Sequence, residues 1–287
     1  MTAPGSGRFG RVRAGSGRYS RSMVEPAPAR RRAGRTERVL VRRIGPGEPA
    51  GRVPDELIVE EPLSIRLDGT LVRTTMRTPG HDFELAAGFC FTEGLLGGAP
   101  VLRCRYCGEA SPVATEYNVV SVETGGRAPT PTPRLGKTSS SCGLCGTESI
   151  DQLTERLSPL GAAPFPVELL VDLPGRAGAD QPLFDRTGAV HAAAVFDRSG
   201  DLVVLREDIG RHNAVDKVVG RLLLDGRIGP RSHGAGDLAM YVSGRASFEM
   251  VQKAWAAGVA ALVAVSAPSA LAVRTASAAR LQLAGFA

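Results

Sequence analysis

The pattern of apolar and polar positions marks the first half of the chain as rich in strands. Leucine and isoleucine recur at every second position before Asp68-Gly69, and the apolar pattern resumes at Leu71. An Asp-Gly pair between two such runs is typical of a tight β-hairpin, so residues 57–77 predict two paired strands. Residues 117–123 contain another strand-like run.

A helix is predicted after the break at Pro79-Gly80, with Asp82 as a candidate cap. Its apolar positions fall on one face of a helix: Phe83, Ala86, Ala87 and Cys90. Because this one-sided spacing is typical of a helix packed on a core, we expect Cys90 to be a buried small hydrophobic residue.

The second half of the chain alternates strand-like and helix-like segments. Strands are predicted over residues 167–171, 201–207, 237–244 and 259–268. Helices are predicted over residues 147–157, 191–197, 211–226, 247–258 and 269–281. Strands that alternate with helices predict a three-layer α/β domain in which at least part of the sheet is parallel.

Composition and charge set the first segment apart from the rest. Residues 1–43 hold twelve arginines against Glu25 and Glu37, a local charge of +10, while the whole chain carries +6, so the remainder is net acidic. The segment has no apolar periodicity and predicts a disordered extension. It has no apolar secretory signal, and the longest apolar stretch is far shorter than the roughly 20 residues of a membrane helix. We expect a cytoplasmic protein that binds neither membrane nor nucleic acid.

These patterns predict four parts along the chain. A disordered arginine-rich extension covers 1–43, and a smaller β-rich α+β subdomain with the hairpin covers 44–136. A mobile loop with two cysteines covers 137–147, and the larger α/β domain covers 148–287.

Three predicted strand-to-helix loops are candidates for ligand binding: residues 207–213, 243–247 and 266–269. In open α/β sheets, ligands bind beyond the carboxyl ends of the strands, and helix N-termini favour phosphates. Arg211 and Arg245 add guanidinium groups that suit anions. The alternative is ordinary helix capping with incidental arginines, since none of the loops is a P-loop or a G-x-G-x-x-G motif.

Five cysteines and no export signal indicate reduced thiols with chemical or metal-binding roles. The residues alone leave three interpretations open. Cys104, Cys107, Cys142 and Cys145 have the C-x₂-C…C-x₂-C pattern of a closed zinc site, which spacing alone favours. Cys142 and Cys145 could instead exchange between dithiol and disulfide. In the third interpretation, one of them carries sulfur or another group on a mobile loop rich in glycine and serine.

Several stretches, in order from Glu60 to Val273, resemble the formate dehydrogenase accessory sulfurtransferases, the FdhD-type sulfur carriers. The most specific are SSCGLCG at residues 140–146 and EDIGRHNAVDK at residues 207–217. The resemblance implies a fold similar to cytidine deaminases in the C-terminal domain and a homodimer. It also implies that a cysteine desulfurase loads sulfur onto the Cys-x-x-Cys loop as a persulfide. The carrier then passes the sulfur to the molybdenum (or tungsten) bis-guanine-dinucleotide cofactor of a formate dehydrogenase.

Carried onto this sequence, the resemblance implies that Cys142 bears the persulfide and that Cys145 is its partner. The implied cofactor-binding residues are Arg211, His212, Asn213, Ser243, Gly244, Arg245, Ser266 and Phe286. No tightly held catalytic metal is expected. The stretch TGAVHAA is similar to the histidine helix of the deaminases, but Ala193 stands in the place of their general-base glutamate, which disfavours deamination. The alternatives are a zinc-stabilised binding protein whose arginine tail contacts nucleic acid, and a dithiol oxidoreductase.

Overall fold

The structure is a computed structural model, and it describes residues 34–45, 47, 51–107, 118–131, 149–229 and 236–287. Its largest sheet has the strand order β11-β10-β9-β7-β8. These strands are β7 (His191–Phe196), β8 (Leu202–Asp208), β9 (Ala239–Val242), β10 (Ala261–Ala264) and β11 (Gln282–Gly285). Strands β9, β10 and β11 are parallel, whereas β7 is antiparallel to both of its neighbours.

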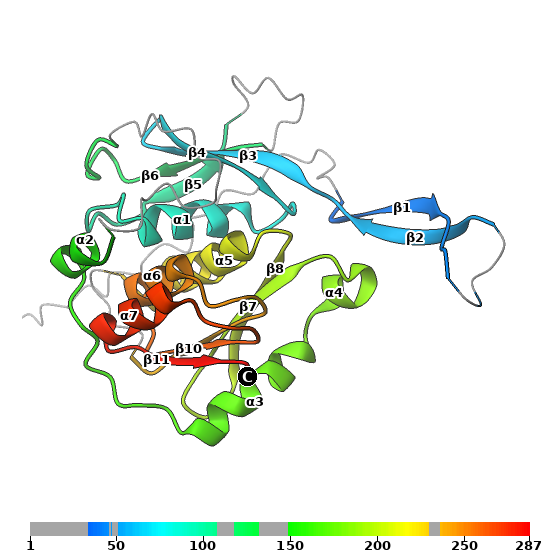
Figure 1. Cartoon of the computed structure of the whole chain (residues 1–287). Helices are drawn as coiled ribbons and strands as arrows, with labels where there is room; N and C mark the ends of the chain where they lie inside the picture. Colours follow the sequence, from blue (N-terminus) through cyan, green and yellow to red (C-terminus); the bar gives the residue numbers. More distant parts are fainter. Residues whose placement is uncertain (1–33, 46, 48–50, 108–117, 132–148, 230–235) are drawn as a thin grey trace, which may run out of the picture.

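Helices cover both faces of this sheet (Figure 1). One face packs on α5 (Arg211–Leu224), α6 (Phe248–Ala256) and α7 (Ala270–Ala279), and the other packs on α3 (Val167–Gly178). The alternation along β7 shows the division, because Ala193 and Val195 face α5 whereas Ala194 and Phe196 face α3. The prediction of an α/β domain with a partly parallel sheet is confirmed, and its likeness to cytidine deaminases stays a prediction.

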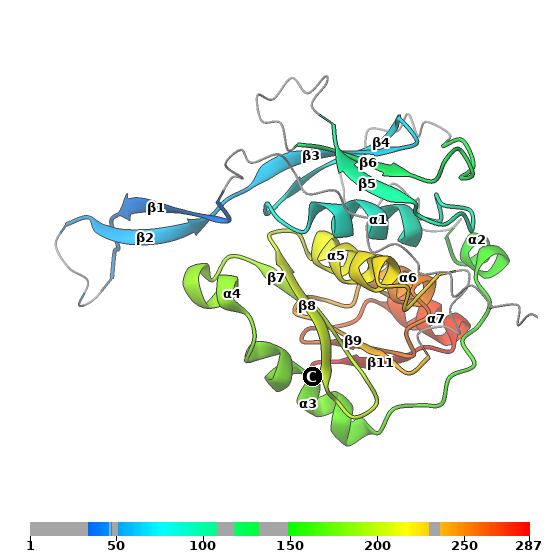
Figure 2. The ribbon, with the colours of Figure 1, turned by 180° about the vertical axis from the view of Figure 1, so that it is seen from behind.

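A second sheet has the strand order β4-β3-β6-β5 and lies on the side of α5 that faces away from the large sheet (Figures 1 and 2). Its strands are β3 (Glu61–Leu67), β4 (Thr70–Arg77), β5 (Arg103–Tyr106) and β6 (Val119–Glu123). The predicted hairpin is confirmed, since β3 pairs with β4 and both Asp68 and Gly69 have the positive φ of a tight primed turn, 45° and 87°. Helix α1 (Asp82–Thr92) lies between this sheet and α5 (Figure 2).

The predicted face of α1 is buried, and Cys90 has no exposed surface, as the sequence pattern predicts. The prediction that Asp82 caps this helix is wrong. His81 occupies the cap position with φ 57°, and Asp82 is the first helical residue. Its carboxylate instead accepts two hydrogen bonds from Arg77, at 3.1 and 3.0 Å.

Helices α1 and α5 approach each other closely at two glycines. A Cβ atom built on Gly220 would lie 1.8 Å from the carbonyl oxygen of Glu84, and one on Gly88 would lie 1.9 Å from that of Asp216. Both obstacles are backbone atoms, so the helices would have to move apart to accept any side chain.

We expect Gly220→Ala to destabilise the protein by about 3 kcal/mol, because overpacking a rigid contact between helices costs more than alanine gains in helix propensity. Urea unfolding measures the change. Gly175→Ala is the matched control, since Gly175 lies in α3 with no atom within 4 Å of the built Cβ. This control is expected to raise stability by about 0.5–1 kcal/mol. A Gly220→Ala variant as stable as the control would contradict the close contact.

Strands β1 (Thr36–Val41) and β2 (Val53–Ile58) form a separate antiparallel ribbon that projects from the body (Figures 1 and 2). Arg186 of α4 (Pro182–Thr187) ties its base to the body through hydrogen bonds to Glu56 (2.7 Å) and Thr36 (2.8 Å). Strand β1 lies inside the segment 1–43, so the prediction of disorder is wrong for Thr36–Val41. The alternation of apolar and polar residues is hidden there, because the exposed position between Val39 and Val41 is the apolar Leu40.

Two secondary-structure predictions in the second half are wrong. The predicted helix 191–197 is wrong, because His191–Phe196 form strand β7. Its three alanines fit a central strand covered on both faces, where packing outweighs helix propensity. Residues 167–171 begin helix α3 rather than form a strand, and Leu170, Leu173 and Ala177 are buried at helical spacing. Strand β11 was not predicted, whereas α2 (Ser149–Arg156) lies within the predicted helix 147–157.

Candidate functional site

The three predicted loops meet at one edge of the large sheet. Because β7 is antiparallel to β8 and to β9, strands β8, β9 and β10 run in the same direction and end at the same edge. Their loops lead to the N-termini of α5, α6 and α7. His191 lies at this edge too, since it begins β7 opposite Asp208. The edge therefore collects arginine, histidine and serine side chains near three helix N-termini.

His191, Ser243 and Arg211 surround a notch left by Gly244. Ser243 Oγ accepts the N–H of Ala192 at 2.9 Å and lies 3.3 Å from His191 Nδ1. A Cβ on Gly244 would lie 3.5 Å from Arg211 Cδ and 3.7 Å from His191 Cε1, so a methyl group would fit and fill the notch. Burial lowers the pKa of His191, and the neighbouring Arg211 and His212 lower it further.

Two nitrogens at this edge are buried without a hydrogen-bond partner among the described residues, Arg211 Nε and His212 Nε2. His212 Nε2 lies 3.7 Å from Glu249 Oε2, beyond hydrogen-bond distance, and the Ser247 hydroxyl donates to the same oxygen at 2.7 Å. Buried donors are nearly always satisfied in proteins. An acceptor such as a phosphate oxygen would therefore complete this part of the site.

The next two loops are joined to each other and to the end of the chain. Ala246 forms a parallel bridge with Pro268, and Phe286 N–H donates to the carbonyl oxygen of Ser266 at 3.4 Å. Phe286 follows β11 with 77% of its surface exposed, and Arg245 is exposed as well. The structure thus brings together Arg211, His212, Ser243, Gly244, Arg245, Ser266 and Phe286 along the edge.

Asn213 differs from the other predicted cofactor-binding residues because its side chain is committed to protein partners. Its amide Nδ2 donates to Met76 O at 2.7 Å and to Asp208 Oδ1 at 2.9 Å, and Thr75 donates to its Oδ1 at 3.4 Å. Asn213 is buried between β4 and β8, and this position argues against a direct ligand contact.

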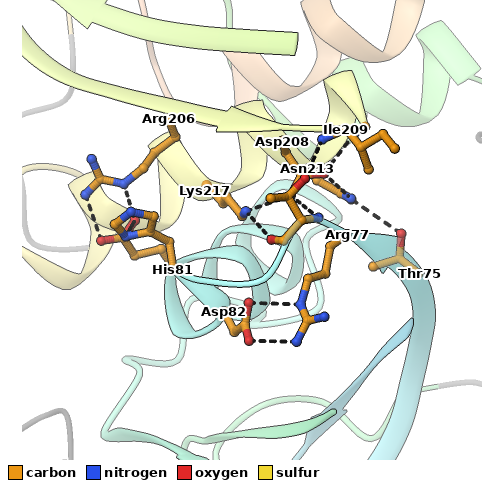
Figure 3. A network of polar contacts seen from close by, with 12 residues as sticks. Thr75, Arg77, His81, Asp82, Arg206, Asp208, Ile209, Asn213 and Lys217 are labelled. Carbon is orange, nitrogen blue, oxygen red and sulfur yellow. Dashed lines mark hydrogen bonds and ion pairs between the residues drawn. The ribbon is translucent and has the colours of Figure 1, made fainter. Parts of the chain in front are cut away.

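A buried ion pair links the end of β8 to α5 (Figure 3). Lys217 Nζ is 2.6 Å from Asp208 Oδ2, and neither side chain has exposed surface. Lys217 also donates to the carbonyl oxygen of Thr78 at 2.9 Å, and Thr78 N–H donates to Asp208 Oδ2 at 3.2 Å. Thr78 follows β4, so the ion pair joins the smaller sheet to β8 and to α5, which begins with Arg211 and His212.

A second ionic contact joins helix α1, which packs on the smaller sheet, to strand β8 of the large sheet. Arg206 Nε and Nη2 donate to the two carboxylate oxygens of Glu84 at 2.6 and 2.9 Å. Burial by itself raises the pKa of Glu84, but the hydrogen bonds from Arg206 and His81 outweigh it and lower the pKa to about 2. Glu84 is therefore ionised at neutral pH.

Most of the motif at residues 207–217 is structural. Glu207 accepts the N–H groups of Leu183 and Phe184 at the start of α4, and Asp216 pairs with Lys253 at 2.8 Å. Within this motif, Arg211 and His212 are the side chains left with a buried nitrogen lacking a partner. Sequence reasoning did not place His191 in the site, although the stretch TGAVHAA singled it out. The sequence predicts a helix at residues 191–197, whereas strand β7 places His191 at the edge of the large sheet.

Cys142 and Cys145 lie outside the described residues. Cys104 lies in β5 with its thiol in the core beneath the smaller sheet, and burial raises its pKa to about 12. Side chains three positions apart on an extended strand point to opposite faces, so Cys104 and Cys107 do not converge as a zinc ligand pair would. In the part of the chain that the structure describes, no three histidine, cysteine or acidic side chains cluster as metal ligands.

Among the described helices, none is long and apolar enough to cross a membrane.

Comparison with known proteins connects this arrangement to one family. A family model described as "FdhD/NarQ family" matches residues 58–287. A "Sulfur carrier protein FdhD" from Streptomyces avermitilis is 50% identical over 260 residues, covering 88% of this chain and 90% of the relative. One of the same name from Streptomyces coelicolor is 51% identical over 261 residues, with the same coverage. The crystal structure of a formate dehydrogenase accessory protein from Desulfotalea psychrophila is similar as well. Its TM-score is 0.65 at 25% identity, and the match covers 88% of this chain and 92% of that one.

Proposed function

This chain belongs to the FdhD/NarQ family, and from that premise we propose that it is a sulfur carrier required for formate dehydrogenase activity. In this proposal, sulfur comes from a cysteine desulfurase, travels as a persulfide on Cys142, and is delivered to the molybdenum bis-guanine-dinucleotide cofactor. The cofactor is the acceptor substrate of the carrier.

The observation that carries the acceptor half of the proposal is the pair of buried nitrogens without partners at the sheet edge, Arg211 Nε and His212 Nε2. A guanine dinucleotide brings a diphosphate whose oxygens are acceptors for such donors. The N-termini of α5, α6 and α7 add a favourable field for negative charge, and the notch at Gly244 allows the backbone to be approached closely. The residues present therefore fit the phosphate part of the acceptor.

Loading is a thiol–persulfide exchange. The thiolate of Cys142 attacks the outer sulfur of the desulfurase persulfide, a new S–S bond forms on Cys142, and the donor cysteine leaves as a thiolate. The donor S–S bond breaks as the new one forms, so the exchange needs no added oxidant or reductant.

Release uses the second thiol. The thiolate of Cys145 attacks the inner sulfur of the Cys142 persulfide, a Cys142–Cys145 disulfide forms, and the outer sulfur leaves as hydrosulfide for the metal of the acceptor. The electrons that reduce the sulfur come from the two cysteines. A dithiol reductant then reopens the disulfide for another cycle.

The test is a mass measurement on the intact chain. Incubation with a cysteine desulfurase and cysteine is expected to add about 32 Da, the mass of one sulfur atom, and a thiol reductant should remove it. If the mass stays unchanged under conditions in which the desulfurase forms its own persulfide, the chain is not a persulfide carrier.

A further inference from the structure

We propose that His191 is a further ligand-contacting residue of the acceptor site, and that it takes up a proton when the diphosphate of the acceptor binds. The inference rests on the proposed function, because it assumes an anionic acceptor at the edge of the large sheet. It adds a residue from β7 to a site that the sequence assigned to loops after β8, β9 and β10.

The position of His191 carries the inference. It begins the strand that runs antiparallel to β8 and β9, so its side chain lies among the loops that follow those strands. Its ring borders the notch at Gly244, as Arg211 does, with Cε1 and Nδ1 each 3.7 Å from a Cβ built there. A phosphate placed in this notch would contact the imidazole and the guanidinium together.

The Ser243 hydroxyl holds the ring in place. Its oxygen accepts the Ala192 N–H at 2.9 Å and lies 3.3 Å from His191 Nδ1, so one ring nitrogen is engaged by the protein. The other nitrogen, Nε2, is left to serve a ligand. The ring orientation is therefore set before any ligand binds, which reduces the entropy lost on binding.

The charges around His191 explain the coupling to a proton. Arg211 and His212 of α5 disfavour a positive imidazole, while Asp208 of β8 favours one. On the neighbouring loop and helix, Arg245 adds positive charge and Glu249 negative charge, the latter facing His212. Burial and the cations prevail and hold the pKa of His191 below its ordinary value, so the neutral ring is favoured at pH 7.

An anion in the notch reverses this balance. A phosphate beside the ring offsets the charges of Arg211 and His212 and raises the pKa of His191 in the complex. Because the bound form then holds more protons than the free form, affinity is greatest at low pH and decreases as the pH rises through the pKa of the complex. A neutral residue at position 191 cannot contribute to this proton uptake.

The experiment is calorimetric titration of the full chain with guanosine diphosphate, which represents the phosphate-bearing end of the acceptor. Each protein is titrated at a single pH in two buffers that differ in ionisation enthalpy, so the difference in heat reports the protons taken up. Wild type is compared with His191→Gln, and with His81→Gln as a matched loss of one histidine that pairs with Glu84 on α1. The nucleotide and His212 are present in all three proteins, so the comparison reports the change in proton uptake that loss of His191 causes.

We expect wild type and His81→Gln to take up more protons on binding than His191→Gln. His191→Gln should bind about tenfold more weakly near pH 6.5, the loss expected for a hydrogen bond to a charged group. Gly244→Ala should weaken binding at every pH without changing the thermal midpoint, because its methyl group fits the free protein but fills the notch.

Equal proton uptake by wild type and His191→Gln would overturn the inference. If wild type does not bind guanosine diphosphate at all, both this inference and the acceptor half of the proposed function fail. The carrier half is judged separately, by the gain of sulfur mass.

Discussion

Replacing Cys142 with alanine is expected to abolish the gain of one sulfur atom from a cysteine desulfurase, and Cys145→Ala is expected to load sulfur but not to release it. The thiolate is the nucleophile in persulfide exchange, so a carrier cysteine must be able to ionise. Intact mass after loading, and again after addition of an acceptor, distinguishes the two variants. Formate dehydrogenase activity should be lost with either substitution.

The other three cysteines show which thiols can ionise, and one of them provides a control variant. Cys90 and Cys104 are buried in the core under the smaller sheet, and burial raises the pKa of both thiols well above the ordinary range. Neither can form a thiolate near neutral pH. Cys107 is partly exposed, so Cys107→Ala is the matched control and should load as wild type does. Loading by Cys142→Ala but not by Cys145→Ala would exchange their roles, and loss of loading in Cys107→Ala would move the persulfide to that residue.

Replacing Lys217 with methionine is expected to destabilise the protein by about 3–5 kcal/mol, because it leaves the carboxylate of Asp208 buried without its counter-ion. Burial lowers the pKa of Lys217, against the opposing effect of Asp208, so the cost of desolvation is already large in the intact pair. Asp208 also accepts from Gly210 and Asn213, which fix the start of α5. Denaturant unfolding at neutral pH measures the loss.

Two further variants serve as controls for the Lys217→Met measurement. Arg221→Met removes, from the same helix, a half-exposed arginine that pairs with Asp225 and lies 3.8 Å from Glu84, and should change stability by no more than about 1 kcal/mol. The double variant Asp208→Asn with Lys217→Met removes both charges, and should recover part of the loss because no uncompensated carboxylate stays buried. If Lys217→Met is no less stable than Arg221→Met, the buried pair does not hold the two parts of the molecule together.

Local patterns predicted most of the α/β part of the fold. The positions of α5, α6, α7 and their preceding strands agree with the apolar periodicity, since each of these elements buries one side or both in the core. The errors fell where local preference and tertiary position disagree. The alanines of β7 favour a helix in isolation and form a central strand, and β1 shows no apolar alternation because Leu40 is apolar at an exposed position.

The candidate site also contains residues that sequence pattern selected and one residue that only the tertiary structure places there. Spacing and strand-to-helix order were enough to select Arg211, Ser243, Gly244 and Ser266, because parallel strands necessarily end at one edge of a sheet. Asn213 was selected with them, but its amide is used between Met76 and Asp208. His191 was left out because its place depends on an antiparallel strand that its own residues do not predict.

What the sequence determined by itself is the family, the order of strands and helices in the second half, and the presence of two thiols spaced for exchange chemistry. Each of these depends on residues close together along the chain. Only the tertiary structure decided that Asp208 and Lys217 of the motif at 207–217 form a buried ion pair and that Gly88 and Gly220 let two helices touch. It also decided that His191 and Arg211 both lie beside Gly244. The physical reason is that hydrogen bonding, close packing and charge proximity depend on distance in space. Thr78 and Asp208, and the glycine contacts of Gly88 and Gly220, join residues more than a hundred positions apart in sequence, and His191 and Arg211 belong to different elements.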